Sequence, residues 1–119
     1  MEKNIFRVFI ISLFLMSFQG GKDCTKLPNI FSNYQQACTL VKSSVFRLHE
    51  NVDTSNSSWI RAANYYSCDS KTGFLIIKAD QTEYIHQNVP INVWYAFKNA
   101  SSFGSYYSSN IKGRYAIKL

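Results

Sequence analysis

The sequence predicts an α+β fold: a small antiparallel meander of three or four strands packed against one main helix. Between residues 59 and 87, aromatic and apolar segments alternate with short polar turns, a spacing typical of antiparallel hairpins. Pro90 then opens a segment with apolar residues at helical spacing. An extra N-terminal helix and a short C-terminal helical segment complete this fold, and 119 residues have room for one such domain.

The first twenty residues form a separate segment. Lys3 and Arg7 make a basic start, and an apolar run from Ile5 to Phe18 leads to small residues near Gly20. This order is typical of a secretory signal peptide, and the run is shorter than the roughly 20 residues that span a bilayer. We expect cleavage near Gly20, which places the mature chain in the periplasm or outside the cell. An uncleaved anchor or a buried first helix is the alternative.

The chain after the leader is basic. It keeps 11 Lys and Arg (13 − 2) and 6 Asp and Glu (7 − 1), a net charge near +5. Such a charge favours an anionic or macromolecular partner, although solubility explains it equally well. The mature chain is expected to contain no transmembrane segment.

Residues 21–57 are expected to form a helical extension followed by a polar loop. A helix of roughly 12 to 14 residues should begin near Pro28 and end at Ser43-Ser44. Apolar side chains recur along it at steps of three and four residues: Ile30, Phe31, Tyr34, Ala37, Cys38 and Val41. Val45 to His49 can form a short strand, and residues 51–58 are polar.

The next segments carry the sheet. Trp59 to Ser67 is an aromatic strand, and the turn after it ends at Gly73, which can adopt positive φ. The continuous apolar run Phe74 to Ile77 predicts a central strand covered on both faces. Asp80-Gln81 turns the chain into a last strand, Thr82 to Gln87.

The main helix follows Pro90. Its apolar stripe should dock on the sheet, with Trp94 at the edge of the stripe formed by Val89, Val93, Ala96, Phe97 and Ala100. Gly104 is expected to end this helix in the left-handed conformation. Ser105 can cap a short further helix through Ile111, which Gly113 breaks.

Several spaced motifs of this region resemble those of the KTSC domain, a module found at the C-terminus of some lysyl-tRNA synthetases and as stand-alone bacterial proteins. The motifs are Tyr84-Ile85-His86, Val89-Pro90, Ala100-Ser101-Phe103-Gly104-Ser105-Tyr106 and Asn110-Ile111-Lys112. The resemblance runs from near residue 58 to the end. It divides the chain into a leader (1–20), the N-terminal extension (21–57) and a KTSC-like domain (58–119), and it implies RNA as one candidate ligand.

Three cysteines remain after the leader: Cys24, Cys38 and Cys68. In an oxidising compartment two of them can pair. Cys24 lies on an extended lead that could fold back along the helix carrying Cys38, so this pair is the expected disulfide, and an unbridged chain is the alternative.

Catalysis is not expected. Cys68 could serve as a nucleophile only with a nearby base, and Asp69 beside it would raise the pKa of its thiol. The carboxylates have no catalytic spacing, and no Cys or His spacing is typical of a metal site. We therefore expect neither a cofactor nor a metal, and a cysteine hydrolase is the third-ranked hypothesis.

Binding is the better hypothesis. Tyr84 and His86 alternate onto one strand face, where they either form a stacking surface that titrates near pH 6.5 or lie buried as structural residues. The tail should return to that face and bring Asn110, Lys112 and Arg114 close to the two rings, while Lys98 is a further candidate for phosphate contacts. The leading hypothesis is a non-enzymatic interaction domain outside the cytoplasm, and an RNA-binding domain is the alternative.

Overall fold

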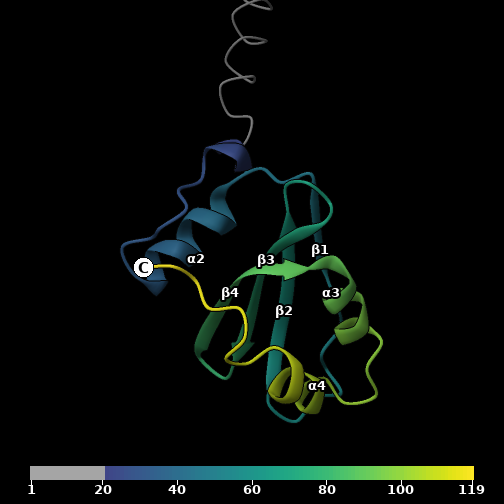
Figure 1. The fold of residues 1–119 in the computed structure, drawn as a ribbon. Coiled ribbons are helices and arrows are strands. Elements are labelled where there is room, and N and C mark those ends of the chain that lie inside the picture. The colour runs from purple at the N-terminus through teal and green to yellow at the C-terminus, as the bar shows by residue number, and fades with distance from the viewer. Residues whose placement is uncertain (1–20) are drawn as a thin grey trace, which may run out of the picture.

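The computed structural model describes residues 21–119 (Figure 1). A four-stranded antiparallel sheet has one α-helix before it in the chain and two after it. The elements are η1 (Cys24–Lys26), α2 (Tyr34–Ser43), β1 (Leu48–Asn51), β2 (Ile60–Ser67), β3 (Thr72–Ala79), β4 (Thr82–Pro90), α3 (Ile91–Lys98) and α4 (Phe103–Asn110). This architecture confirms the predicted α+β fold. None of the helices within these residues is long and apolar enough to cross a membrane.

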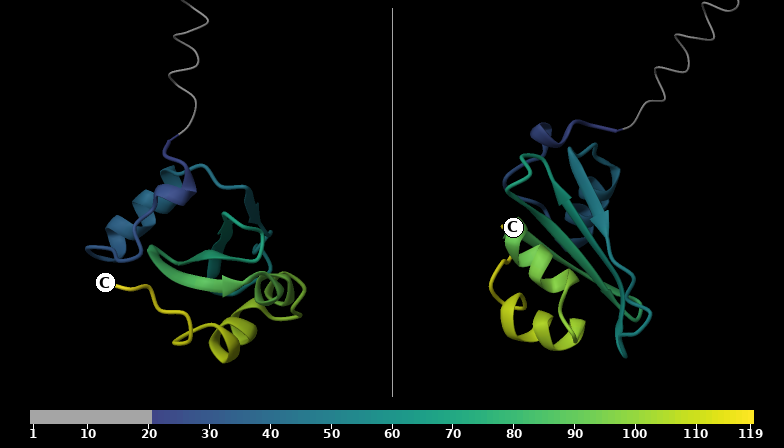
Figure 2. Two further views of the ribbon diagram at one scale, coloured as in Figure 1. Left: turned by 45° about the horizontal axis from the view of Figure 1, so that its top comes forward. Right: turned by 90° about the vertical axis from the view of Figure 1, so that its right-hand side faces the viewer.

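The strands follow one another in the order β1-β2-β3-β4, so the sheet is a simple meander. Helices cover both faces of β3. Leu75 and Ile77 belong to the core under α3 and α4, while Ile76 belongs to the core under α2, where Phe74 packs at its border. This arrangement confirms the central strand that the continuous apolar run predicted. Figure 2 shows α3 and α4 together on one side of the sheet.

Trp94 is the centre of the core under α3. Its side chain is fully buried, stacks on Tyr65 with ring centroids 5.4 Å apart, and donates through Nε1 to Glu50 Oε1 at 2.8 Å. The predicted place of Trp94 at the edge of the stripe is therefore wrong, and Ala96 is exposed instead. Trp94 and Phe97 lie three positions apart on α3 and so share the face that meets the sheet, whereas Ala96, two positions from Trp94, does not.

Gly104 does not end the main helix. That helix stops at Lys98, and Gly104 lies in the first turn of α4, which Ser102 caps by accepting from the Ser105 N–H at 3.2 Å. The Trp59 indole contacts Gly104 so closely that a Cβ there would lie 2.3 Å from Nε1. The glycine is required for this close approach and not for positive φ.

Replacing Gly104 with alanine tests this contact. Because Trp59 must move to admit the methyl group, we expect the free energy of unfolding to fall by about 1–3 kcal/mol, although alanine favours helix. Urea denaturation of the variant measures the change. Gly113→Ala is the control, because a Cβ at Gly113 meets no atom within 4 Å and only its φ of 80° disfavours alanine. A Gly104→Ala variant as stable as the parent would contradict the close contact between Gly104 and Trp59.

The core under α2 unites segments that are distant in sequence. Phe31, Val41, Ile85 and Ile117 are all buried there. The helix begins later than predicted, at Tyr34, because the Asn33 side chain accepts from the Gln36 N–H at 2.7 Å. The strand expected from Val45 likewise begins later, at Leu48.

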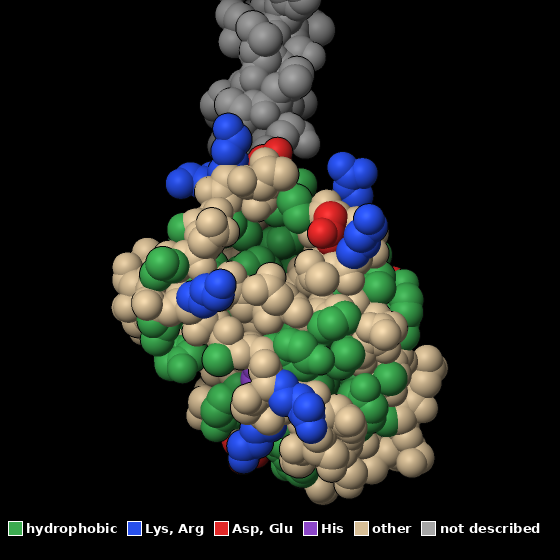
Figure 3. All heavy atoms as spheres, viewed as in Figure 1, with side chains coloured by type: hydrophobic (Ala, Val, Ile, Leu, Met, Phe, Trp, Pro, Cys, Tyr) green, Lys and Arg blue, Asp and Glu red, His purple; other side chains and the backbone are tan. Residues whose placement is uncertain are grey.

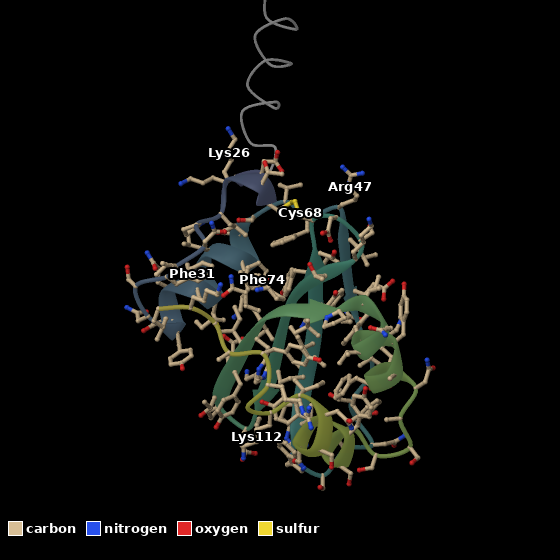
Figure 4. The ribbon with its side chains drawn as sticks, in the orientation of Figure 1. Lys26, Phe31, Arg47, Cys68, Phe74 and Lys112 are labelled. Atoms are coloured by element: carbon tan, nitrogen blue, oxygen red, sulfur yellow. A yellow bond between two sulfur atoms is a disulfide. The ribbon has the colours of Figure 1, made fainter. Side chains whose placement is uncertain are left out.

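The disulfide joins Cys24 to Cys68, with Cα atoms 5.9 Å apart, and the predicted Cys24–Cys38 pair is wrong (Figure 4). Cys38 lies on the buried face of α2, where it packs as a free thiol. The lead does not fold back along α2. A short parallel bridge holds it against Val45 instead, with the Cys24 N–H donating to the Val45 carbonyl at 3.0 Å. That pairing brings Cys24 to the end of β2.

A bulge in β4 sets which side chains face α3. Asn88 has φ of 60°, and the β3–β4 register shifts there. The extra residue places Val89 in the same core as Leu75, and its carbonyl accepts from the Tyr65 hydroxyl at 2.7 Å. In the β2–β3 turn the positive φ belongs to Ser70, at 62°, and Gly73 lies inside β3 against the Tyr66 carbonyl.

The C-terminal segment covers part of the outer edge of β4. Gln87 donates its N–H to the Tyr115 carbonyl at 2.9 Å, and Ala116 bridges His86. The segment then passes to the α2 side, where Ile117 is buried and the Phe31 N–H donates to the Lys118 carbonyl at 2.8 Å. The part of the β4 edge from Thr82 to Tyr84 is left uncovered by this segment.

Candidate functional site

An apolar groove of about 730 Å³ lies at the end of β4 that the C-terminal segment leaves open. We call it the β4 groove. The lining comes from α2, β3, β4 and α4, from the residue before β2 and from the segment after α4. Its members are Tyr34, Trp59, Ala79, Thr82, Glu83, Tyr84, Ile85, His86, Tyr107, Lys112, Gly113 and Ala116. Figure 3 shows a hollow between apolar side chains in which a histidine is visible, with basic side chains beside it.

His86 lies at the base of the groove and is only 7% exposed. Its Nε2 shares a 2.8 Å hydrogen bond with the Tyr107 hydroxyl, and the two rings meet edge to face. Burial lowers the pKa of His86 to about 4, with the Tyr115 carbonyl partly opposing that shift. The imidazole is therefore neutral at pH 7, and the burial of His86 agrees with the alternative in which it is a hydrogen-bonded structural residue.

Tyr84 forms the open rim of the groove. It shares the strand face of His86, as the alternation predicted, while Ile85 points into the core under α2. Its side chain is 47% exposed, in contrast to that of His86. The exposed alternative therefore holds for Tyr84, and the buried alternative holds for His86. Of this pair, only Tyr84 offers a ring that a ligand could cover, and Tyr34 on the α2 side of the groove is exposed as well, at 57%.

Lys112 is the tail residue that reaches the groove, below β4 and beside α4 (Figure 4). Asn110 and Arg114 flank it in the chain but do not line the groove, and the Asn110 amide donates back to the Tyr106 carbonyl at 3.2 Å. Lys98 lies elsewhere, on α3, with its Nζ 2.9 Å from Glu50 Oε1. The composite site thus unites Tyr84, His86 and Lys112.

The groove carries one positive charge that has no ion-pair partner within residues 21–119, that of Lys112. The carboxylate of Glu83 also lines the groove, but Lys42 Nζ binds both of its oxygens, at 2.7 and 2.6 Å. Because the imidazole is neutral as well, the electrostatic character of the groove depends on Lys112.

Trp59 and Tyr107 are groove residues that the sequence reasoning did not single out. Their rings meet edge to face with centroids 5.9 Å apart. Tyr107 had a detectable signal, since it follows Gly104 by three residues and precedes Ile111 by four, which is the buried face of α4. Trp59 precedes β2 and had no such periodicity.

Within residues 21–119 the cysteines are either bonded to each other or buried. Cys68 is bonded to Cys24, and burial is the main cause that raises the pKa of the Cys38 thiol. Asp23 lies close enough to both sulfurs of the disulfide to resemble a metal site. Sulfurs that are bonded to each other are not thiolate ligands, so we assign no metal there.

Comparison with known proteins gives one finding. The family model of the KTSC domain matches residues 56–115, half of the chain. No curated protein and no solved structure matches. The matched residues run from the loop before β2 to Tyr115 and include Trp59, Tyr84, His86, Tyr107 and Lys112 of the β4 groove. The motifs noted in the sequence and this match agree, and the chain belongs to the KTSC domain family.

Proposed function

We propose that the protein is a non-enzymatic interaction domain that acts outside the cytoplasm and binds its partner in the β4 groove. The observation that carries the proposal is the groove itself: apolar walls, an exposed tyrosine at the rim and one lysine without an ion pair among residues 21–119. Its volume of about 730 Å³ lies in the range of small-ligand sites, and such sites combine apolar walls with few polar groups.

The disulfide supports a location outside the cytoplasm. Structural disulfides persist in the periplasm and in secreted proteins and are rare in the cytosol. The Cys24–Cys68 bond therefore agrees with the leader expected at residues 1–20, which lie outside the described residues. The mature chain is expected to start between about Gln19 and Lys22. Mass spectrometry of the protein from its native host determines that start, and a full-length chain in the cytosolic fraction would contradict it.

The absence of enzymatic activity is part of the proposal. A nucleophile needs a base within hydrogen-bond reach. In the β4 groove the imidazole of His86 is hydrogen-bonded to Tyr107, and the carboxylate of Glu83 is bound to Lys42. His86 and Tyr107 are both buried, at 7% and 4% exposure, so little of this hydrogen-bonded pair is accessible to a substrate.

Binding at the groove can be tested by site-specific photocrosslinking. A photoreactive phenylalanine analogue at position 84 is expected to give a crosslinked product in the native host. The same analogue at position 95 is the matched control, because Tyr95 is similarly exposed (42% against 47%) but lies on α3. Equal crosslinking at both positions, or none at position 84, would contradict a partner in the groove.

A titration with single-stranded RNA and DNA in about 0.15 M salt separates the RNA-binding alternative from this proposal. We expect weak binding that Tyr84→Ala does not change, because Lys98 is paired with Glu50 outside the groove and Lys112 is then the one lysine of the groove lining that can contact phosphates. Submicromolar binding that both Tyr84→Ala and Lys112→Ala weaken would make RNA binding the better hypothesis.

A further inference from the structure

We infer that the β4 groove takes an apolar monoanion: a small ligand with a flat apolar body and a single negative charge. The inference rests on the proposed function and names the ligand class of that same site. Three features of the groove lead to it: which walls a ligand can cover, which polar groups are already engaged, and where the remaining charge lies.

The walls favour a flat apolar body. Trp59 and Tyr107 already meet edge to face, and Tyr84 presents an exposed ring on β4, the strand that carries the buried His86. Aromatic rings prefer edge-to-face or offset-stacked partners at centroid distances of about 4.5–7 Å. A flat ligand lying against Tyr84 and the edge of Trp59 would remove these rings from water.

The engaged polar groups disfavour a neutral ligand rich in hydroxyls. His86 Nε2 and the Tyr107 hydroxyl satisfy each other, and Lys42 holds both oxygens of Glu83. A sugar that entered the groove would leave most of its hydroxyls without partners, and burying an unpaired hydroxyl is costly. The lining therefore selects against such a ligand.

The remaining charge favours one anionic group on the ligand. Lys112 is the lining cation without an ion pair among the described residues, and a lysine is a compact point charge that suits one carboxylate or sulfonate. A polyanion needs several cations, and Lys98 lies on α3, outside the groove, where Glu50 of β1 holds it. One negative charge matches the groove and several do not.

Two fluorescent probes with the same aromatic skeleton test the inference on the mature, oxidised protein. 8-Anilinonaphthalene-1-sulfonate carries one sulfonate, and N-phenyl-1-naphthylamine lacks it. We expect the sulfonate to bind about 10-fold more tightly, and Lys112→Gln to remove that preference while leaving the neutral probe unchanged. Tyr84→Ala should weaken both probes about 5-fold.

Matched controls separate the groove from general effects. Lys71→Gln removes one charge just before β3, at the end of the strand opposite to the groove residue Ala79. Tyr95→Ala removes a ring on α3 that is about as exposed as that of Tyr84. Neither variant should change the affinity for either probe. Circular dichroism and urea denaturation verify that each variant is folded, since loosened proteins also bind these dyes.

The outcomes separate the preference for one negative charge from the use of the groove as the binding site. Equal affinities for the two probes, with both weakened by Tyr84→Ala, would overturn the single-charge inference and leave the groove as the binding site. Affinities that Tyr84→Ala does not change would overturn the groove as well, and the proposed function would fail with it. A sulfonate affinity that falls with Lys112→Gln and not with Lys71→Gln supports the inference.

Discussion

Replacing both Cys24 and Cys68 with serine is expected to lower the free energy of unfolding by about 4 kcal/mol. The bond closes a loop with a sequence separation of 44 residues, and the chain-entropy relation gives about this value for such a loop. Without the bond, the unfolded chain regains the freedom that the loop restricts. Urea denaturation of the oxidised protein and of the double variant measures the difference.

Cys38→Ala is the control for this experiment, because it removes the free thiol and leaves the bond in place. Its effect should be much smaller, since it deletes only a sulfur from the core under α2. Thiol titration of the denatured, unreduced protein should find one reactive cysteine. Three reactive cysteines, or a double variant as stable as the parent, would contradict the Cys24–Cys68 assignment.

Lowering the pH from about 7 to about 4 is expected to cost roughly 3 kcal/mol of stability through His86 alone. The pKa of this residue is about 4 in the folded protein and about 6.5 when unfolded, and each unit of difference corresponds to about 1.4 kcal/mol. Above pH 6.5 both states hold a neutral imidazole, so there is no effect. As the pH falls below 6.5 the unfolded state binds the proton first, and stability is lost progressively down to about pH 4.

His86→Gln isolates this contribution. The amide can still hydrogen-bond to Tyr107 but does not titrate, so its stability should decline less steeply between pH 6.5 and 4. Carboxyl groups with lowered pKa values, such as Glu50 and Asp69, lose their stabilising bonds at still lower pH in both proteins. Parallel pH profiles for the parent and the variant would show that His86 is not the buried neutral group described here.

The sheet was predictable because its signals are local. A continuous apolar run indicates a strand covered on both sides, and Phe74 to Ile77 is that strand. Asp80 adopts φ of 55° in the predicted turn, a conformation that Asp tolerates better than most residues. In contrast, the role of Gly104 depends on Trp59, which is distant in sequence, so the glycine was taken for a helix stop.

The candidate site was predictable only in part. The return of the tail brought Lys112 to Tyr84 and His86 because the chain after α4 has few surfaces left to cover. Lys98 lies outside this groove, and its pairing with Glu50 of β1 could not be predicted because no local pattern links the two residues. The cysteine pairing failed for the same reason, since it depends on the bridge between the lead and Val45.

The crossing of the C-terminal segment from the β4 edge to the α2 side affects the order in which the parts of the fold can form. Ile117 completes the core that also contains Phe31 and Ile85, and Lys118 accepts the hydrogen bond from Phe31. Until Ile117 docks, the part of this core that it covers stays in contact with water. The core under α2 is therefore completed by contacts between residues that are distant in sequence, and such contacts form slowly in folding because a long loop must close first.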